Sequence, residues 1–216
     1  MRITISKENY VKAIAEAESD GETVKAVTLA RWLGVSAPAV TMAVKRLRRD
    51  GLILVGKEGQ VVLTPSGREI ANRLLNRHHL IERMLTEIFG LEWYKVHDEA
   101  EQLEHAVSAD FERKLIEKLG TGGVCPHGNT VGMDSPRERR RRGLKPLEEA
   151  GTDERVAVVS VFERDRKLLE FLDRAGIRPG VRLEVVSAGQ VVELVADGRA
   201  VRLERPAAAK VWVQTV

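Results

Sequence analysis

Apolar residues in the first part of the chain repeat with the spacing of amphipathic helices. In SKENYVKAIAEAES they predict a helix that ends near Gly21. A second helix ends at Gly34, and a third begins after Ser36, a residue type that caps helix N-termini. Two short helices joined by the residues L-G-V-S are typical of a helix-turn-helix.

The pattern then changes to that of two short strands. The stretch LILVGKEGQVVLTPSG predicts a hairpin whose turn lies at residues 57–60. A hairpin directly after a helix-turn-helix is the wing of a winged helix. We therefore predict a winged-helix DNA-binding domain over residues 1–73.

Helical spacing returns after the hairpin, in two amphipathic stretches that end at Gly90 and Gly120. They predict a helical domain over residues 74–125. Residues 126–154 are rich in Gly, Pro and charge and predict an irregular linker. Short β-rich runs over residues 155–216, with turns roughly every 8 to 10 residues, predict a small barrel with one helix. The predicted fold class is mainly α with a β C-terminal domain.

Composition narrows the possible classes of protein. Hydrophobic residues make up 43% of the chain and charged residues 31%, which is ordinary for a folded soluble protein. No apolar run is long enough to span a membrane, and the N-terminus lacks the apolar core of a signal peptide. Cys125 is the single cysteine, so no internal disulfide can form. We therefore expect a cytoplasmic protein with no membrane partner.

Charge is distributed unevenly. Residues 1–77 carry 13 Lys and Arg against 8 Asp and Glu, whereas residues 78–120 carry 5 against 10. A basic part followed by an acidic part indicates phosphate binding by the first and cation binding by the second.

The third predicted helix has the features of a recognition helix. Its C-terminal half is basic and could reach phosphates, and residues near its start would face the major groove. The alternative is a solvated basic face on an ordinary helical domain, but the wing and the charge asymmetry favour DNA. The residues that we predict to contact DNA are Ser36, Pro38, Thr41, Met42, Lys45, Arg46, Arg49 and Lys57.

Imidazoles and carboxylates share one stripe of a predicted helix. His97, Glu101, Glu104 and His105 are spaced i, i+4, i+7 and i+8, beside the apolar face. Carboxylates at the edge of a core need nearby cations, and Lys and Arg are nearly absent from this stripe. The pattern predicts a divalent metal ion such as Mn²⁺, Fe²⁺ or Zn²⁺. Solvated surface charges are the alternative.

The preceding predicted helix adds His78 and Glu82, a second pair at i and i+4. Cys125 and His127 form a further possible ligand pair in C-P-H-G-N, but no second pair lies nearby in the sequence. We therefore interpret C-P-H-G-N as a turn. The run RERRRRG at residues 137–143 is interpreted as a solvated linker rather than a nucleic-acid contact.

Several motifs together resemble the diphtheria toxin repressor family of metal-dependent regulators. They are S-A-P-A-V-T…R-L-x-R-D-G-L, L-T-P-S-G, R-H-x-L-x-E-R-M-L, G-L-x-x-x-K-V-H-D-E-A-E-x-L-E-H, C-P-H-G-N and L-x-x-x-G-I-x-P-G. The resemblance implies a winged-helix domain, a helical dimerisation domain with two metal sites, and an SH3-like (FeoA-like) C-terminal domain. It also implies homodimers that bind operator DNA in the presence of Fe²⁺ or Mn²⁺ and repress genes of metal uptake and homeostasis.

The resemblance also implies two sets of metal ligands. The primary, regulatory site would use Asn9, Glu101, Glu104 and His105. The ancillary site would use His78, Glu82 and His97, together with Glu163 or Asp165 from the C-terminal domain.

The regulatory set departs from that of the iron-responsive members, which have Cys where this chain has Glu101 and Met where it has Asn9. Replacing sulfur by oxygen shifts metal preference toward Mn²⁺. We predict a Mn²⁺-activated, sequence-specific repressor, with Fe²⁺ as the alternative ion and Co²⁺, Ni²⁺ or Zn²⁺ as surrogates. Its expected partners are double-stranded operator DNA and a second copy of the chain.

Three other functions are weaker alternatives. A metallohydrolase would need an additional acid, base or phosphate-binding loop beside the ligands, and the sequence offers none, so we expect no enzymatic activity. A winged-helix regulator could instead sense an organic ligand or redox state. A metal-independent interaction module acting through the C-terminal barrel is the third.

Overall fold

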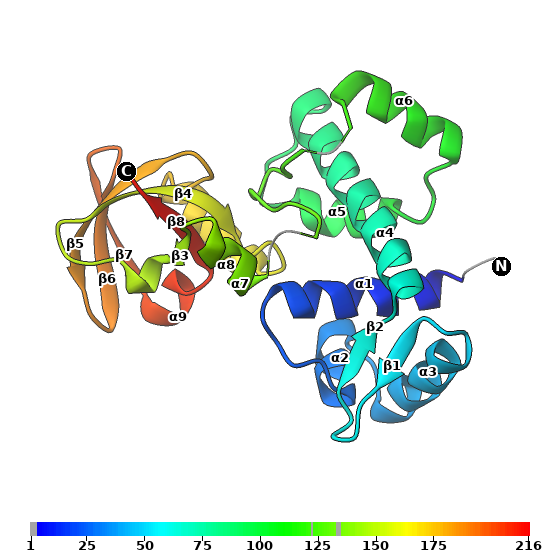
Figure 1. Ribbon diagram of the computed structural model, residues 1–216. Helices are drawn as coiled ribbons and strands as arrows, with labels where there is room; N and C mark the ends of the chain where they lie inside the picture. Colours follow the sequence, from blue (N-terminus) through cyan, green and yellow to red (C-terminus); the bar gives the residue numbers. More distant parts are fainter. Residues whose placement is uncertain (1–3, 122, 133–134) are drawn as a thin grey trace. The chain divides into compact units, whose positions relative to one another are not determined.

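The computed structural model describes residues 4–121, 123–132 and 135–216 (Figure 1). These residues form two compact units. The first contains Met1–His78 and Val131–Pro136, and the second contains His79–Thr130 and Arg137–Val216.

The first unit is the predicted winged helix. Its elements are α1 (Ile5–Ser19), α2 (Ala26–Leu33), α3 (Ala37–Arg49), β1 (Ile53–Val55), β2 (Val61–Leu63) and most of α4 (Pro65–Arg83). Gly34 ends α2 in the left-handed conformation, with φ 63°, and the Ser36 hydroxyl caps α3 by accepting from Ala39 N at 3.4 Å. Strands β1 and β2 pair antiparallel. The helix-turn-helix and its wing are therefore confirmed.

The core of the first unit joins α1 to the helix-turn-helix and the wing. Val11, Ile14, Leu29, Leu47 and Ile53 are at most 1% exposed and belong to one apolar cluster. These residues occupy the apolar positions that the sequence pattern assigns to the inner face of each helix or strand, and the structure packs them together.

A lysine is buried in the same unit. Lys12 is 3% exposed, and its Nζ lies 3.0 Å from His78 Nδ1 and 3.8 Å from Glu16 Oε1. A buried ammonium needs such partners, because its desolvation is costly. The His78 ring is therefore positioned by a lysine of α1.

The second unit begins with helices. After His78, α4 runs into a π-helical turn at Met84–Ile88 and is followed by α5 (Val96–Leu103) and α6 (Ala109–Leu119). One uninterrupted helix was expected across residues 96–119. Instead, the chain turns after Leu103, and Ser108 caps α6 by accepting from Phe111 N at 3.2 Å. Glu104 and His105 consequently lie in the turn rather than on the helix.

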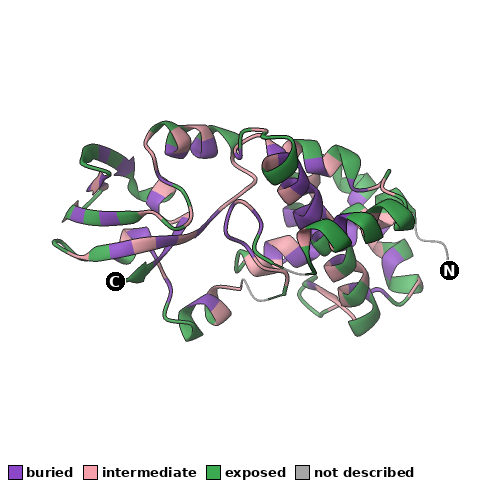
Figure 2. Cartoon of the chain, turned by 90° about the horizontal axis from the view of Figure 1, so that it is seen from above, coloured by how far each residue is buried: buried purple, intermediate pink, exposed green. Residues whose placement is uncertain are grey.

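The rest of the second unit is a six-stranded antiparallel sheet in the order β3-β8-β4-β5-β6-β7. The strands are β3 (Lys145–Pro146), β4 (Arg155–Val161), β5 (Arg182–Ala188), β6 (Val191–Ala196), β7 (Arg199–Glu204) and β8 (Val211–Thr215). Helices α8 (Arg166–Arg174) and α9 (Arg205–Ala208) accompany them. Figure 2 shows buried residues alternating with more exposed ones along the strands, as in β5, because one face of the sheet covers the core. Trp93, which precedes α5, belongs to the same core cluster as the sheet.

The stretch expected to be an irregular linker contains regular structure. It includes α7 (Pro136–Arg141), β3 and the 3-10 turn Leu147–Glu149. Arg139 is 6% exposed, lies 5.0 Å over the Trp212 ring, and donates to Asn129 Oδ1 at 3.1 Å. Residues 136–149 are therefore not an irregular linker, because the stacking of Arg139 on Trp212 and its hydrogen bond to Asn129 hold them to distant parts of the second unit.

Among the described residues, no single helix is long and apolar enough to cross a membrane, although α2 and α3 meet that test together as a pair bent by 113°.

One glycine controls how α4 packs on the wing. A Cβ at Gly67 would lie 2.0 Å from the Leu52 carbonyl oxygen, a backbone atom that cannot move freely. We expect Gly67→Ala to lower the free energy of unfolding of the first unit by about 1–3 kcal/mol, as overpacking does. Urea unfolding followed by circular dichroism measures this. Gly56→Ala is the control, since its Cβ would meet nothing closer than 3.7 Å; equal losses in both variants would contradict the steric explanation.

Candidate metal centre

Three of the sequence-predicted ligands meet in the interior of the second unit. Glu82 comes from α4, His97 from α5, and Glu163 from the turn between β4 and α8. Glu82 is 0% and His97 3% exposed. His97 Nδ1 lies 3.3 Å from Glu82 Oε1 and 3.8 Å from Glu163 Oε1. Residues separated by up to 81 positions in the sequence thus form one buried acid–imidazole cluster.

The C-P-H-G-N segment contributes two more side chains to this cluster. Cys125 Sγ donates to Glu163 Oε2 at 3.4 Å. His127 Nδ1 lies 3.4 Å from Glu82 Oε1 and 3.5 Å from Glu163 Oε2. The segment does turn, with Gly128 N donating to Cys125 O at 2.9 Å, but its interpretation as a turn alone is wrong. The C-x-H spacing was the one sequence signal that this segment could bind a metal. The second pair of possible ligands, Glu82 and Glu163, comes from distant positions in the sequence.

Backbone geometry places this segment against β4. Gly128 has φ 86°, and a Cβ there would lie 2.0 Å from the Val159 carbonyl oxygen. Asn129 Nδ2 donates to Glu163 Oε2 at 2.7 Å and to Val161 O at 3.1 Å. Glycine therefore permits the close approach, and Asn129 orients the Glu163 carboxylate.

The orientation of the His127 ring follows from a backbone contact. His127 Nε2 lies 2.9 Å from the Trp93 carbonyl oxygen, which can only accept a hydrogen bond. Nε2 therefore carries a proton, and Nδ1 is the ring atom that faces Glu82 and Glu163. A backbone carbonyl that orients a ligating histidine in this way is common at metal sites.

The donor set fits a metal ion. One possible ligand atom each from His79, Glu82, Cys125 and Glu163 lies within 4.8 Å of the other three. Ligands bound at about 2.0–2.3 Å to one ion are at most roughly 4.6 Å apart, so small side-chain movements would suffice. Carboxylate, imidazole and thiolate together suit a borderline divalent ion. His79 had no assigned role from sequence, because its neighbour His78 has the i, i+4 spacing to Glu82.

Protons balance the buried carboxylates when no metal is bound. Burial by itself lowers the pKa of His97, but hydrogen bonds with Glu101 and Glu82 outweigh it and raise the pKa to about 10. Burial likewise opposes the charged form of His127, yet Glu82 and Glu163 raise its pKa to about 10. Burial raises the pKa of the Cys125 thiol well above its usual range. A divalent cation could replace these protons.

The two remaining ancillary candidates are Asp165 and His78. Asp165 caps α8 by accepting from Leu168 N at 3.1 Å, and it pairs with Lys210 Nζ at 2.6 Å. Of the two acidic candidates in this turn, Glu163 is therefore the one in the cluster. His78, the last residue of the first unit, precedes Glu82 by one turn of α4 and contacts Lys12.

The predicted regulatory ligands have a different environment. The Glu101 side chain is 40% exposed, with Oε1 3.0 Å from Arg164 Nη1 and 3.6 Å from His97 Nε2. Glu104 is 2% exposed, and its Oε1 lies 3.5 Å from His105 Nε2. Asn9 is exposed on α1 in the first unit. Glu104 and His105 are therefore neighbours, and Glu101 is engaged by an arginine.

All of the residues predicted to contact DNA are exposed in the first unit. Ser36 caps the N-terminus of α3, and Lys57 lies in the turn of the wing. Thr41 Oγ1 donates to Ala37 O at 3.0 Å, which leaves its oxygen able to accept from a base or phosphate. Met42 is 55% exposed. The remaining predicted contacts, also exposed, are Pro38, Lys45, Arg46 and Arg49.

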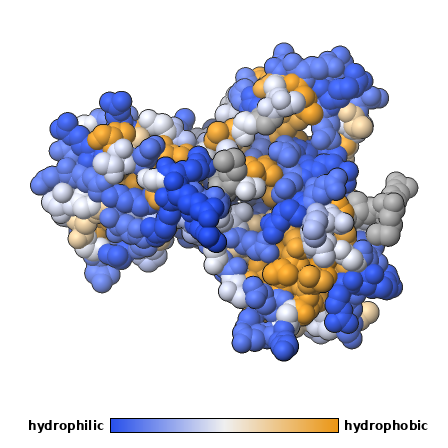
Figure 3. Space-filling model, in the orientation of Figure 1, coloured by the Kyte–Doolittle hydropathy of each residue, from blue (hydrophilic) through white to orange (hydrophobic). Residues whose placement is uncertain are grey.

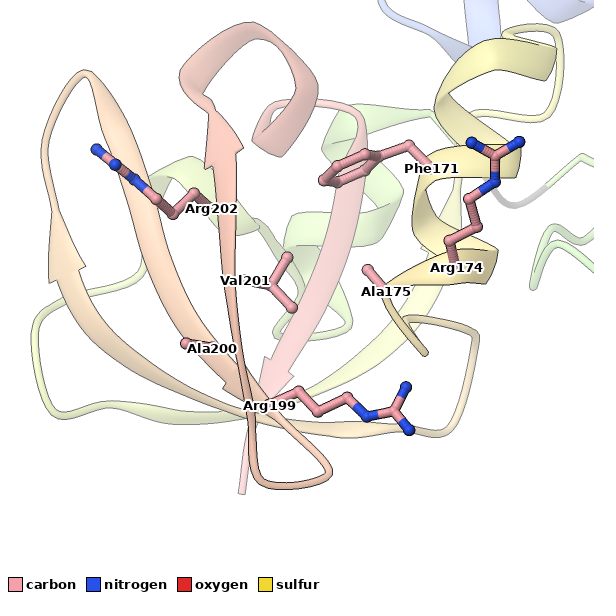
Figure 4. A pocket seen from close by; sticks show the side chains of 7 residues that line it. All are labelled: Phe171, Arg174, Ala175, Arg199, Ala200, Val201 and Arg202. Carbon is pink, nitrogen blue, oxygen red and sulfur yellow. The ribbon is translucent and has the colours of Figure 1, made fainter.

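A surface hollow of about 390 Å³ lies between α8 and β7. Phe171 and Val201 line it, but the guanidinium groups of Arg174, Arg199 and Arg202 point in different directions (Figure 4). The charges therefore do not converge on one ligand.

Family models match three stretches of the chain. Residues 2–61 match the iron dependent repressor N-terminal DNA binding domain, and residues 64–131 match the iron dependent repressor metal binding and dimerisation domain. Residues 145–215 match the FeoA domain. The chain is also 34% identical over 218 residues to the diphtheria toxin repressor of Corynebacterium efficiens, covering 92% of this chain and 94% of the relative. The chain belongs to the diphtheria toxin repressor family.

Further relatives and solved structures support this family assignment. The iron-dependent repressor IdeR of Mycobacterium tuberculosis is 32% identical, with 88% of each chain covered. Among solved structures, a manganese-dependent transcriptional repressor in complex with manganese has a TM-score of 0.86 at 30% identity, covering 97% of this chain and 100% of that one. The IdeR of T. acidophilum has a TM-score of 0.79 at 25% identity, with full coverage of both chains. The family consists of metal-dependent, DNA-binding transcriptional repressors, and this is the function class of the chain.

The buried histidines predict how stability depends on pH. Because folding raises the pKa of His97 and His127 from 6.5 to about 10, their protonation stabilises the metal-free fold fully below pH 6.5. This contribution is lost as pH rises through about 10. Urea midpoints measured in a chelator should therefore fall between pH 6.5 and 10. The decline should be shallower in His97→Gln and in His127→Gln; slopes that match the unmodified protein would contradict the assignment.

Proposed function

We propose that this family member is a manganese-responsive repressor. The observation that carries the proposal is the donor set Glu101, Glu104 and His105, which contains no sulfur and lies on and just after α5. Carboxylate and imidazole donors suit Mn²⁺, whereas thiolate and thioether donors favour softer ions. The structural neighbour solved with manganese is consistent with this choice. Fe²⁺ is the runner-up, because imidazole and carboxylate also bind it.

The proposed mechanism couples the regulatory ion to the orientation of the DNA-reading helix. Asn9 lies on α1, whose apolar face packs in the same core as α3. An ion bound by Asn9, Glu101, Glu104 and His105 would restrict α1 and, through the shared core, α3. By linkage, operator DNA would tighten metal binding by the same factor.

Operator recognition is proposed to use a homodimer. The helical part of the second unit exposes apolar side chains, among them Ile88, Phe89, Leu103 and Phe111, with Phe89 at 65%. Figure 3 shows apolar surface in this part of the chain. Large apolar side chains that remain exposed are candidates for burial between two copies of the chain. A two-fold dimer would present two α3 helices to successive half-sites.

The buried cluster is proposed as the second, ancillary metal site. The ligand set implied by the family resemblance is His78, Glu82, His97 and Glu163. The geometry also offers a second set, His79, Glu82, Cys125 and Glu163, with His127 beside it. The two sets share both carboxylates, so one ion at a time would occupy the cluster.

Binding to DNA in a graded metal series tests the function. A duplex selected from random sequences with the Mn²⁺-loaded protein serves as the operator, and salt is held constant because ionic strength alone changes affinity. Because affinity alone follows the Irving–Williams order, the informative quantity is operator affinity at saturating metal, which we expect to be highest with Mn²⁺. A higher operator affinity with saturating Fe²⁺ would favour the runner-up. Equal affinity with and without metal would overturn both.

Glu104 tests the regulatory site. Glu104→Ala removes a carboxylate ligand and should weaken Mn²⁺ activation by at least about tenfold. Glu99→Ala, an exposed acidic position on α5, removes the same charge and should leave the activation midpoint unchanged. Identical behaviour of the two variants would mean that the regulatory ion lies elsewhere.

Cobalt distinguishes the two ancillary ligand sets. If Cys125 ligates the ion, the Co²⁺-loaded protein should show a thiolate-to-cobalt charge-transfer band that disappears in Cys125→Ser. A Co²⁺ spectrum without this band would exclude Cys125 and favour the set that contains His78 and His97. Glu82→Gln is the positive control, because both sets require its carboxylate.

A further inference from the structure

Arg164 contacts a proposed regulatory ligand. It lies in the turn between β4 and α8, and its Nη1 is 3.0 Å from Glu101 Oε1. The two side chains are 23% and 40% exposed, so the pair is partly shielded from water. We propose that Arg164 is an internal counter-ion of Glu101 that competes with the regulatory metal ion and thereby raises the metal concentration needed for activation. This inference rests on the proposed role of Glu101.

The competition follows from the chemistry of the pair. A carboxylate oxygen that accepts a charge-assisted hydrogen bond from a guanidinium loses part of its capacity to donate to a cation. A divalent ion at Glu101 would also be repelled by a guanidinium 3.0 Å from the ligand oxygen. Arginine stays protonated at all physiological pH values, so metal binding requires Arg164 to move away from Glu101.

Glu163 and Arg164 are consecutive residues with opposite roles. Glu163 accepts from Cys125 and Asn129 in the buried cluster, whereas Arg164 reaches Glu101. His97 lies between them, with Nδ1 3.8 Å from Glu163 and Nε2 3.6 Å from Glu101. The same turn therefore supplies an anion to one proposed site and a cation to a ligand of the other.

Arg166 provides a matched comparison. It lies two residues after Arg164 and pairs with α5 through Asp98, at 3.1 Å, but Asp98 is not a proposed ligand. Removing either arginine changes the net charge equally and removes a hydrogen bond to α5. A difference between the two variants therefore reports on Glu101 itself.

The experiment measures Mn²⁺ binding to the full-length protein without DNA, by the electron paramagnetic resonance of free Mn²⁺. Arg164→Ala should bind Mn²⁺ roughly two- to fivefold more tightly, the effect expected for a partly exposed ion pair. Arg166→Ala should match the unmodified protein. Arg164→Lys, which keeps the charge without the planar fork, should be intermediate. Urea midpoints of all variants establish that they are folded.

Glu101→Gln separates failure of this inference from failure of the proposed function. If Glu101→Gln weakens Mn²⁺ binding but Arg164→Ala behaves like Arg166→Ala, the counter-ion role is overturned and Glu101 remains a ligand. If Glu101→Gln leaves Mn²⁺ binding unchanged, the regulatory assignment of Glu101 is overturned as well. In a Glu101→Gln background, Arg164→Ala should have no further effect; a persistent gain in affinity would mean that Arg164 acts on another group.

Discussion

The second unit depends on how it compensates two neighbouring carboxylates. Glu82 is fully buried and the Glu163 side chain is 11% exposed, and both carboxylates lie within 3.5 Å of His127 Nδ1, where little water can screen their charges. Carboxylates in such a place must be protonated, paired with cations or bound to a metal. In the metal-free protein His97 and His127 meet this need, and both stay charged because their pKa is raised to about 10. A divalent cation bound at the proposed ancillary site would replace these protons with little change in net charge.

This constraint also explains the local architecture around the cluster. Gly128 allows the 125–129 segment to touch β4, and the Trp93 carbonyl orients His127 toward the carboxylates. Trp93 also packs in the core of the sheet and donates to Asp173 in α8 at 2.6 Å. The side chains that position the cluster therefore also join the helices of the second unit to its sheet. Metal binding at the proposed ancillary site would therefore be linked to the integrity of this unit.

The two proposed metal sites differ in solvent exposure and in their metal-free partners. The ancillary cluster is buried, has a thiol within reach, and is balanced by imidazolium groups. Glu101 is 40% exposed and is balanced by the permanently charged Arg164. A buried, preorganised site binds with less rearrangement than a site whose ligand must first leave an ion pair. We expect the ancillary ion to be the more persistent of the two and the regulatory ion to follow the free metal concentration.

The amino-acid sequence by itself determined the winged helix, the helical segments and the strands of the C-terminal domain, because periodicity, caps and turns are local properties. It also identified Glu82, His97 and Glu163 as candidate ligands, although Glu163 was not separated from Asp165. Only the tertiary structure brought Cys125 and His127 to the carboxylates, turned the chain after Leu103, and buried Arg139 against Trp212. The sequence also could not predict that Arg164 pairs with Glu101, because the two residues are 63 positions apart. Spacing reveals neighbours on one helix, whereas contacts between elements depend on how the whole core packs.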